Sequence, residues 1–257
     1  MHAPDELKGL VEQELAGLEL WPELHGQRDS ARYALVEMGG KRVRPVICLA
    51  TGEALGAQLQ QVMPAALAVE LVHNFSLVHD DLPGLDDDAE RRGRASVWSA
   101  YGVGTAVLAG DALLAEAFRL ACSYETPHVA RELVEATLGM IGGQYLDTME
   151  GDADLRIVHR LKTGRLFYAS VTTALWAVGV PERAQAAWRA FAEELGMLFQ
   201  VVDDILDGDG FVLTHGVGGA HELADAAAAR GRAALGEIAG DTAVLARIVD
   251  DLAVRTV

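Results

Sequence analysis

The stretch that decides the fold reads His79-Asp80-Asp81-Leu82-Pro83-Gly84-Leu85-Asp86-Asp87-Asp88. An apolar helical run leads into it through Leu71, Val72, Phe75, Leu77 and Val78. Carboxylates at the mouth of a packed helix either repel one another, which raises their pKa values, or bind cations. Oxygen ligands of this kind suit Mg²⁺ or Ca²⁺, and Mg²⁺ usually takes further oxygens from water and substrate phosphates. This cluster alone leaves both a metal site and an acidic loop after a helix open.

A second acidic cluster lies on another apolar segment, Phe199-Gln200-Val201-Val202-Asp203-Asp204-Ile205-Leu206-Asp207. Asp203 and Asp207 are four residues apart and share one helical face, while Asp204 lies about 100° round the helix from Asp203. Burying carboxylates without partners is costly, so acids on an apolar helix indicate a ligand. The two clusters together favour facing walls of a multi-metal site over two unrelated acidic turns.

The composition is that of a single globular domain, which we expect to span residues 1–257. The chain is 51% apolar and carries a net charge of −17, which argues against nucleic-acid binding and against an anionic membrane surface. Cys48 and Cys122 lie in apolar contexts, which indicates core residues rather than a disulfide framework or a zinc site. We recognise no signal peptide and no apolar run of membrane-spanning length. A cytoplasmic protein without membrane insertion is therefore expected.

Helical periodicity dominates the chain and alternating strand patterns are scarce, so we expect an all-α fold of about ten helices. Several of these helices are apolar all round and should be central. Two segments are expected to be loops, around Arg91–Arg94 and from Gly208 to Gly219. The expected helices run over about 7–18, 30–38, 45–55, 61–82, 103–122, 127–150, 154–178, 181–207, 222–239 and 242–255.

Basic residues concentrate near the acidic clusters. They follow Gly39-Gly40 as Lys41-Arg42-Val43-Arg44, follow the first cluster as Arg91-Arg92, and recur at Lys162. In an acidic protein this arrangement predicts a polyanion that also takes metals. Diphosphate fits, because metals can bridge some of its oxygens while Arg and Lys bind the rest. Any one of these residues could instead pair with a surface acid. The glycine-rich loops that bind nucleotides are absent.

In order and spacing, these residues resemble the trans-isoprenyl diphosphate synthases, the polyprenyl synthetase family that includes farnesyl and geranylgeranyl diphosphate synthases. The resemblance rests on the two aspartate motifs and on Gly39-Gly40-Lys41-Arg42-Val43-Arg44-Pro45, Arg91-Arg92-Gly93, Gly110-Asp111, Gly143-Gln144 and Lys162-Thr163-Gly164. It implies the isoprenoid synthase type I fold, a helical bundle around a deep central cavity, usually as a homodimer. It also implies three Mg²⁺ ions per active site, with Mn²⁺ as an expected substitute. Their ligands would be Asp80, Asp81, Asp86, Asp203, Asp204 and Asp207.

The resemblance also implies substrate contacts. Residues that match the site of isopentenyl diphosphate are Lys41, Arg44, His73 and Arg92. Residues that match the side of the allylic diphosphate are Arg91, Lys162, Thr163 and Gln200. Catalysis is expected to depend on Asp80, Asp81, Asp86, Arg91, Lys162 and Asp203. The implied reaction is Mg²⁺-dependent head-to-tail condensation of isopentenyl diphosphate with dimethylallyl or geranyl diphosphate.

Phe75 and Ser76 match the positions that limit chain length in this family. An aromatic residue at Phe75 accompanies short products, so farnesyl diphosphate is expected as the main product and geranylgeranyl diphosphate as the alternative. The helical wheel alone places Phe75 about 140° from Asp80, which leaves an ordinary packing residue open.

The chain departs from the family in two places. The segment from Gly208 to Gly216 contains no Lys, although most members carry cations there for the allylic diphosphate. Arg94-Ala95-Ser96-Val97-Trp98 stands where Lys-Pro-Thr and a His are common. These differences bear on substrate preference more than on the reaction. Two other classes stay open. A class I terpene cyclase would lack the residues for isopentenyl diphosphate, and a non-catalytic partner subunit would tend to lose aspartates.

Overall fold

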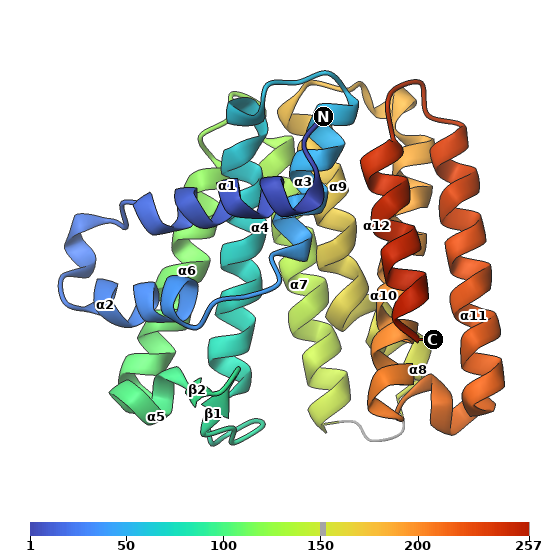
Figure 1. Cartoon of the computed structure of the whole chain (residues 1–257). Coiled ribbons are helices and arrows are strands. Elements are labelled where there is room, and N and C mark those ends of the chain that lie inside the picture. The colour runs from blue at the N-terminus through green and yellow to red at the C-terminus, as the bar shows by residue number, and fades with distance from the viewer. Residues whose placement is uncertain (150–152, 257) are drawn as a thin grey trace.

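Long helices make up nearly all of the regular structure. A computed structural model describes residues 1–149 and 153–256, and Figure 1 shows its helices packed side by side. In these residues the only strands are β1 (Glu90–Arg91) and β2 (Arg94–Ala95), which pair antiparallel where a loop was expected. The expected all-α fold is confirmed. Glu150, the expected end of one helix, lies outside the described residues.

The central helix is α4 (Leu59–Asp80), which ends in the first acidic cluster. It packs against α3 (Val43–Ala54), α6 (Val103–Ala121) and α9 (Arg165–Ala177). By length and composition α4 could span a membrane, which the sequence analysis did not anticipate, but 67% of its most apolar window is buried inside the fold. Neighbours on several sides explain why this helix is apolar all round.

The N-terminal elements cover one face of this core. α1 (Pro4–Gly17) crosses α3 and α4, as Figure 1 shows. The chain continues through η1 (Pro22–Leu24), α2 (Gln27–Arg32) and η2 (Tyr33–Glu37), so the helix expected at 30–38 begins earlier and ends in a π-helical turn.

The middle of the chain supplies the other walls of the bundle. α5 (Val97–Tyr101) and α7 (His128–Met149) precede α8 (Leu155–His159), which runs through a π-helical turn, η3 (Arg160–Gly164), into α9. Such turns are frequent at functional sites, and η3 contains Lys162 and Thr163. η4 (Glu182–Ala184) then leads to α10 (Ala186–Asp207), which carries the second acidic cluster.

The C-terminal helices are α11 (Phe211–Gly236), α12 (Ala243–Ala253) and the short η5 (Val254–Thr256). The expected loop from Gly208 to Gly219 is wrong, because α11 already begins at Phe211. The Phe211 side chain is buried, and its backbone N–H donates to the Asp204 carboxylate at 2.8 Å. Gly216 adopts φ 73°, which kinks the helix and hides it from a search for regular periodicity.

Candidate functional site

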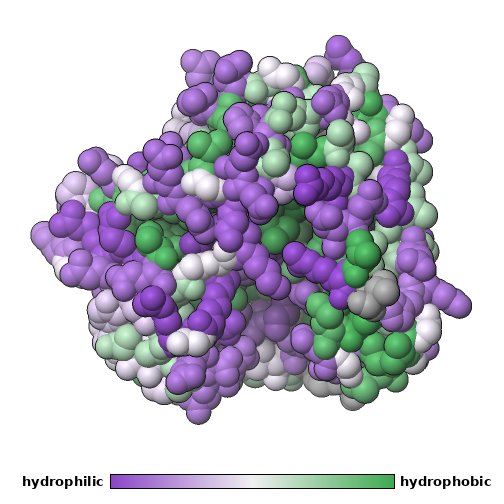
Figure 2. Space-filling model, in the orientation of Figure 1, coloured by the Kyte–Doolittle hydropathy of each residue, from purple (hydrophilic) through white to green (hydrophobic). Residues whose placement is uncertain are grey.

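A cavity of about 290 Å³ opens between α4, α7, η3 and α9. Figure 2 shows a hollow in the lower half of this face with hydrophilic side chains beside it. Predicted site residues that line the cavity are Arg44, His73, Phe75, Ser76, Asp80, Lys162 and Thr163. Leu85, Met140 and Leu166 complete an apolar wall. The cavity therefore joins a charged end to a space suited to a hydrocarbon chain.

Four predicted substrate contacts lie outside this cavity. Arg91 and Arg92 border a small recess next to Asp81, and Lys41 is exposed between α1 and α12. Gln200 faces a different cavity on the far side of α9. Its amide donates to the Asp204 carboxylate at 2.7 Å, one turn along α10, which fixes its direction.

The carboxylates of the first acidic cluster have unlike environments. Burial, reinforced by Asp86 and Asp81, raises the pKa of Asp80 to about 6 against the opposing influence of Lys162 and Arg91. The Asp81 side chain is 1% exposed, and the Arg91 guanidinium donates to it at 2.6 Å. Asp86 is exposed. Burial raises the pKa of Asp81 as well, although the hydrogen bond and charge of Arg91 oppose that shift. Asp80 is the carboxylate that lines the cavity, while Asp81 fixes Arg91.

The second cluster contains two carboxylates whose pKa values shift in opposite directions. Burial raises the pKa of Asp203, although Lys41 and Arg44 oppose that shift. Burial acts on Asp204 as well, but the His159 imidazole, whose Nε2 lies 3.2 Å from Asp204, and hydrogen bonds from the Phe211 N–H and Gln200 outweigh it. They hold the Asp204 pKa below its ordinary value. Both oxygens of Asp204 are therefore already engaged by protein donors. Asp207 is exposed.

The donor set suits Mg²⁺ only together with oxygens from elsewhere. Within 1–149 and 153–256, no three His, Cys, Asp or Glu side chains form a ready-made metal site. Mg²⁺ is usually held by one or two carboxylates plus waters and substrate phosphates. Asp80 and Asp203 fit this role, because a desolvated carboxylate with a raised pKa is stabilised by a nearby cation. Asp81 and Asp204 are predicted metal ligands as well, but their carboxylates already accept hydrogen bonds from protein donors.

The predicted site for isopentenyl diphosphate is strongly cationic. The Arg44 guanidinium lies 4.5 Å from the centre of the Phe167 ring, and burial lowers its pKa to about 10. Burial and the charges of Arg44, Arg92, Arg42 and Arg91 lower the pKa of His73 well below its usual range. His73 is therefore neutral at physiological pH, and it can accept or donate a hydrogen bond.

Glu70 was missed by the sequence analysis. Its side chain is 2% exposed and accepts a hydrogen bond from Arg42 at 2.7 Å, while Asn74 donates to the same oxygen at 3.2 Å. Arg42 also donates to the Leu35 carbonyl at 2.6 Å and starts α3 in the left-handed conformation, with φ 55°. This buried pair fixes the segment that carries Lys41 and Arg44. The sequence signal for Glu70 was its position as a single acid in the apolar run before His73, which indicates a buried carboxylate with a partner.

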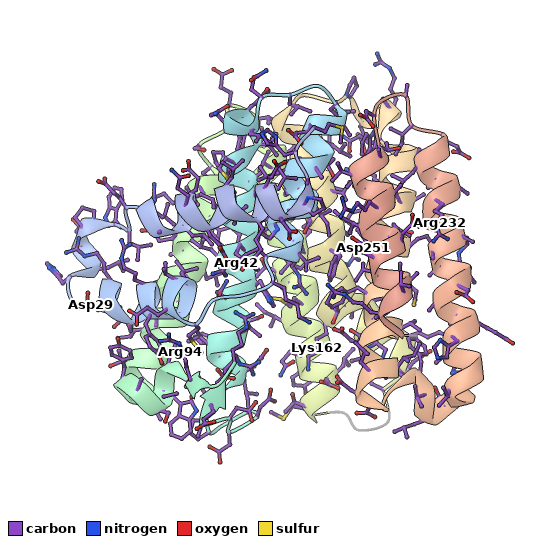
Figure 3. The ribbon with its side chains drawn as sticks, viewed as in Figure 1. Asp29, Arg42, Arg94, Lys162, Arg232 and Asp251 are labelled. Atoms are coloured by element: carbon purple, nitrogen blue, oxygen red, sulfur yellow. The ribbon has the colours of Figure 1, made fainter. Side chains whose placement is uncertain are left out.

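Two further polar residues of α7 were not assigned roles. Gln144 lines the cavity, and both of its amide atoms are buried without a hydrogen-bond partner, which marks a place for a polar ligand atom. Asp147 forms an ion pair with Lys162, which Figure 3 labels beside α7. The spacing of three residues between Gln144 and Asp147 was the only sequence signal, since it puts both on one helical face.

The chain-length positions both line the cavity. Phe75 is buried and its ring meets the His79 ring edge-on, with centroids 5.0 Å apart. The Ser76 hydroxyl donates to the His73 carbonyl at 2.9 Å. Phe75 lies in the cavity wall although the helical wheel turned it away, because the cavity extends along α4.

Comparison with known proteins matches these features to one family. Residues 28–216 match the family model for polyprenyl synthetase. A geranylgeranyl diphosphate synthase from Cyanophora paradoxa is 39% identical over 70% of this chain and 64% of its own length. A farnesyl diphosphate synthase from Bacillus subtilis is 39% identical over 71% of this chain and 67% of its own length. The chain therefore spans about two thirds of these curated relatives.

The fold is shared over a greater length. The crystal structure of a geranyltransferase from Legionella pneumophila superposes with a TM-score of 0.87 and 30% identity, over 98% of this chain and 96% of that one. The match covers both aspartate motifs and the helices that frame the cavity. The chain belongs to the polyprenyl synthetase family.

Proposed function

We propose that the chain is a prenyltransferase that joins isopentenyl diphosphate head-to-tail to dimethylallyl or geranyl diphosphate with the help of Mg²⁺. The observation that carries this proposal is one cavity with Asp80 and Lys162 at its charged end and Phe75 and Leu166 along its apolar wall. Relatives named geranylgeranyl and farnesyl diphosphate synthase support it.

The proposed reaction begins at the allylic diphosphate. Lys162 would bind the leaving diphosphate, and Asp80 and Asp203 would hold Mg²⁺. Three Mg²⁺ ions, or Mn²⁺ in their place, would supply positive charge to the leaving group when bound. The allylic C–O bond breaks, and the double bond of isopentenyl diphosphate, held by Arg44, attacks the resulting carbocation and forms the new C–C bond. The proton lost in the last step passes to the released diphosphate, and the apolar wall keeps water away from the cation.

Farnesyl diphosphate is the proposed main product, with geranylgeranyl diphosphate second. Phe75 borders the cavity five residues before Asp80, and five residues of helix span about 7.5 Å. This length corresponds to a chain of two to three isoprene units. Product analysis by mass spectrometry, after incubation with isopentenyl and dimethylallyl diphosphates and Mg²⁺, tests the proposal. A C15 diphosphate is expected, and the absence of any elongated diphosphate would refute it.

A homodimer is also proposed, with α7 at its interface. Val134, Leu138, Ile141 and Tyr145 are exposed and follow one another at helical spacing along one face of α7. A contiguous row of exposed apolar side chains is more typical of a protein–protein interface than of a surface that stays exposed to solvent. Light scattering should therefore give the mass of two chains, and Leu138→Glu should give that of one. A monomeric wild type would contradict the homodimer.

A cytoplasmic location is proposed as well, because the substrates are water-soluble diphosphates. Cell fractionation should recover the protein with the soluble proteins. Recovery with the membranes after a wash in high salt would contradict this location.

A further inference from the structure

A second cavity is larger than the one that contains Asp80. It has a volume of about 330 Å³ and lies between η3, α9, α10 and α11. No residue lines both cavities, because α9 and α10 touch between them. A Cβ on Gly196 of α10 would lie 3.1 Å from the Cα of Gly164, the last residue of η3, and 3.5 Å from the Cβ of Phe167 on α9. The second cavity is thus a separate space whose side chains the proposed reaction does not use, apart from the predicted contact Gln200.

The lining of this second cavity contains three arginines and two glutamates. Arg160, Arg165 and Arg230 border it, and Arg230 pairs with Glu194 at 2.7 Å. In the part of the chain that the structure describes, neither Arg160 nor Arg165 has a carboxylate partner, and the Arg165 Nε atom is buried without a hydrogen bond. Acids outnumber Lys and Arg in this chain by 38 to 21, so unpaired arginines facing one cavity are unexpected.

The remaining lining is partly apolar. Tyr168 from α9 and Met197 from α10 both line the cavity, and Glu193 is the one acid of the lining, within the described residues, without an ion pair. The cavity is of the size of a small-ligand site. Two guanidinium groups present planar donors that match the oxygens of a phosphate group.

We propose that this cavity binds a phosphate-bearing anion through Arg160 and Arg165, with Tyr168 and Met197 against any apolar part of the ligand. The shared chemistry is the phosphate group, which either a free phosphate or a prenyl phosphate could supply. The site also borders Gln200, whose amide holds Asp204 of the second acidic cluster. A ligand bound in this cavity would therefore be separated from Asp204 by the Gln200 side chain.

The test is calorimetric titration with inorganic phosphate in metal-free buffer. Wild type is compared with Arg160→Gln/Arg165→Gln and with the control Arg232→Gln, whose arginine on α11 pairs with Asp250 away from the cavity and is labelled in Figure 3. The double variant should bind phosphate at least about 10-fold more weakly, because it loses charge-assisted hydrogen bonds to the anion. The control should match wild type.

A second variant guards against misfolding of the first. Arg160 is exposed, so Arg160→Glu alone should fold and should also lose phosphate binding. Lys41→Gln/Arg92→Gln, which removes cations of the predicted isopentenyl diphosphate site, should retain it. The proposal is overturned if wild type does not bind phosphate, if both Arg160 variants bind it like wild type, or if only Lys41→Gln/Arg92→Gln loses it.

Geranyl monophosphate separates the two sources of the anion. Tighter binding than inorganic phosphate, lost in the double variant, would identify a prenyl phosphate as the ligand. Equal binding would identify free phosphate. A geranyl monophosphate affinity that the double variant leaves unchanged would contradict the site.

Discussion

The buried pair of Arg42 and Glu70 provides a sharp test of how the predicted substrate segment is held. Replacing Glu70 by Ala removes the carboxylate that pairs with Arg42, the only such partner within residues 1–149 and 153–256, and both side chains are 2% exposed. The Asn74 amide and the Arg42 guanidinium would then each lose an acceptor at the Glu70 Oε1 atom.

The magnitude follows from the cost of an uncompensated buried charge. Removing one partner of such a pair destabilises a protein by roughly 3–5 kcal/mol. The matched control is Asp251→Asn, which breaks an exposed pair with Arg247 at 3.7 Å and should change the free energy of unfolding by about 0.5 kcal/mol or less. Arg42→Met combined with Glu70→Ala should be less destabilised than the sum of the two single variants, because no unpaired charge remains.

The free energy of unfolding is measured by urea denaturation at one protein concentration, followed by circular dichroism. The proteins compared are the wild type, Glu70→Ala, Arg42→Met, their combination and Asp251→Asn. If Glu70→Ala loses no more stability than Asp251→Asn, the Arg42–Glu70 pair does not hold α3 on α4. Strict additivity in the double variant would show that the two side chains act independently, and the reasoning from the buried ion pair would fail.

Three further predictions concern catalysis. Asp80→Ala and Asp203→Ala should each lower the turnover number by about 10³-fold while leaving the circular dichroism spectrum unchanged, since each removes a main electrostatic element; near-native turnover of both would exclude them as metal ligands. Arg92→Ala should weaken isopentenyl diphosphate by about 10- to 100-fold through loss of a charge-assisted hydrogen bond. An equal loss for the allylic substrate in steady-state kinetics would contradict separate sites. Phe75→Ala should lengthen the product by one or more isoprene units, as mass spectrometry would show, and an unchanged chain length would mean that Phe75 does not close the cavity.

The sequence predicted the helices well where apolar spacing is regular. α3, α4 and α6 begin and end close to the expected residues, because each is bounded by Gly, Pro or acidic residues that break the pattern. α10 ends at the expected Asp207 but begins at Ala186, because the expected start at Pro181 forms the separate turn η4. α11 could not be predicted in the same way. Its first turns are glycine-rich and kinked at Gly216, and a buried hydrogen bond from Phe211 to Asp204 starts the helix. Such a tertiary contact leaves no local pattern.

The candidate site shows the same limit. Its members on the central helix, such as His73 and Asp80, could be placed on a common face from spacing alone. The different environments of Asp203 and Asp204 could not be predicted from spacing. They arise because His159, from another helix, and Gln200, one turn earlier on α10, both contact Asp204. The sequence likewise gave no sign that Gln200 faces the second cavity.

The most direct test of the proposed reaction is the stoichiometry of substrate use. Diphosphate release and incorporation of radiolabelled isopentenyl diphosphate are measured together, with dimethylallyl diphosphate, in the presence and absence of Mg²⁺. A condensation that begins at the allylic diphosphate predicts equal amounts of the two, only when both substrates and Mg²⁺ are present. Diphosphate release from the allylic substrate alone would indicate a cyclase. Binding of both substrates without turnover would contradict a catalytic chain.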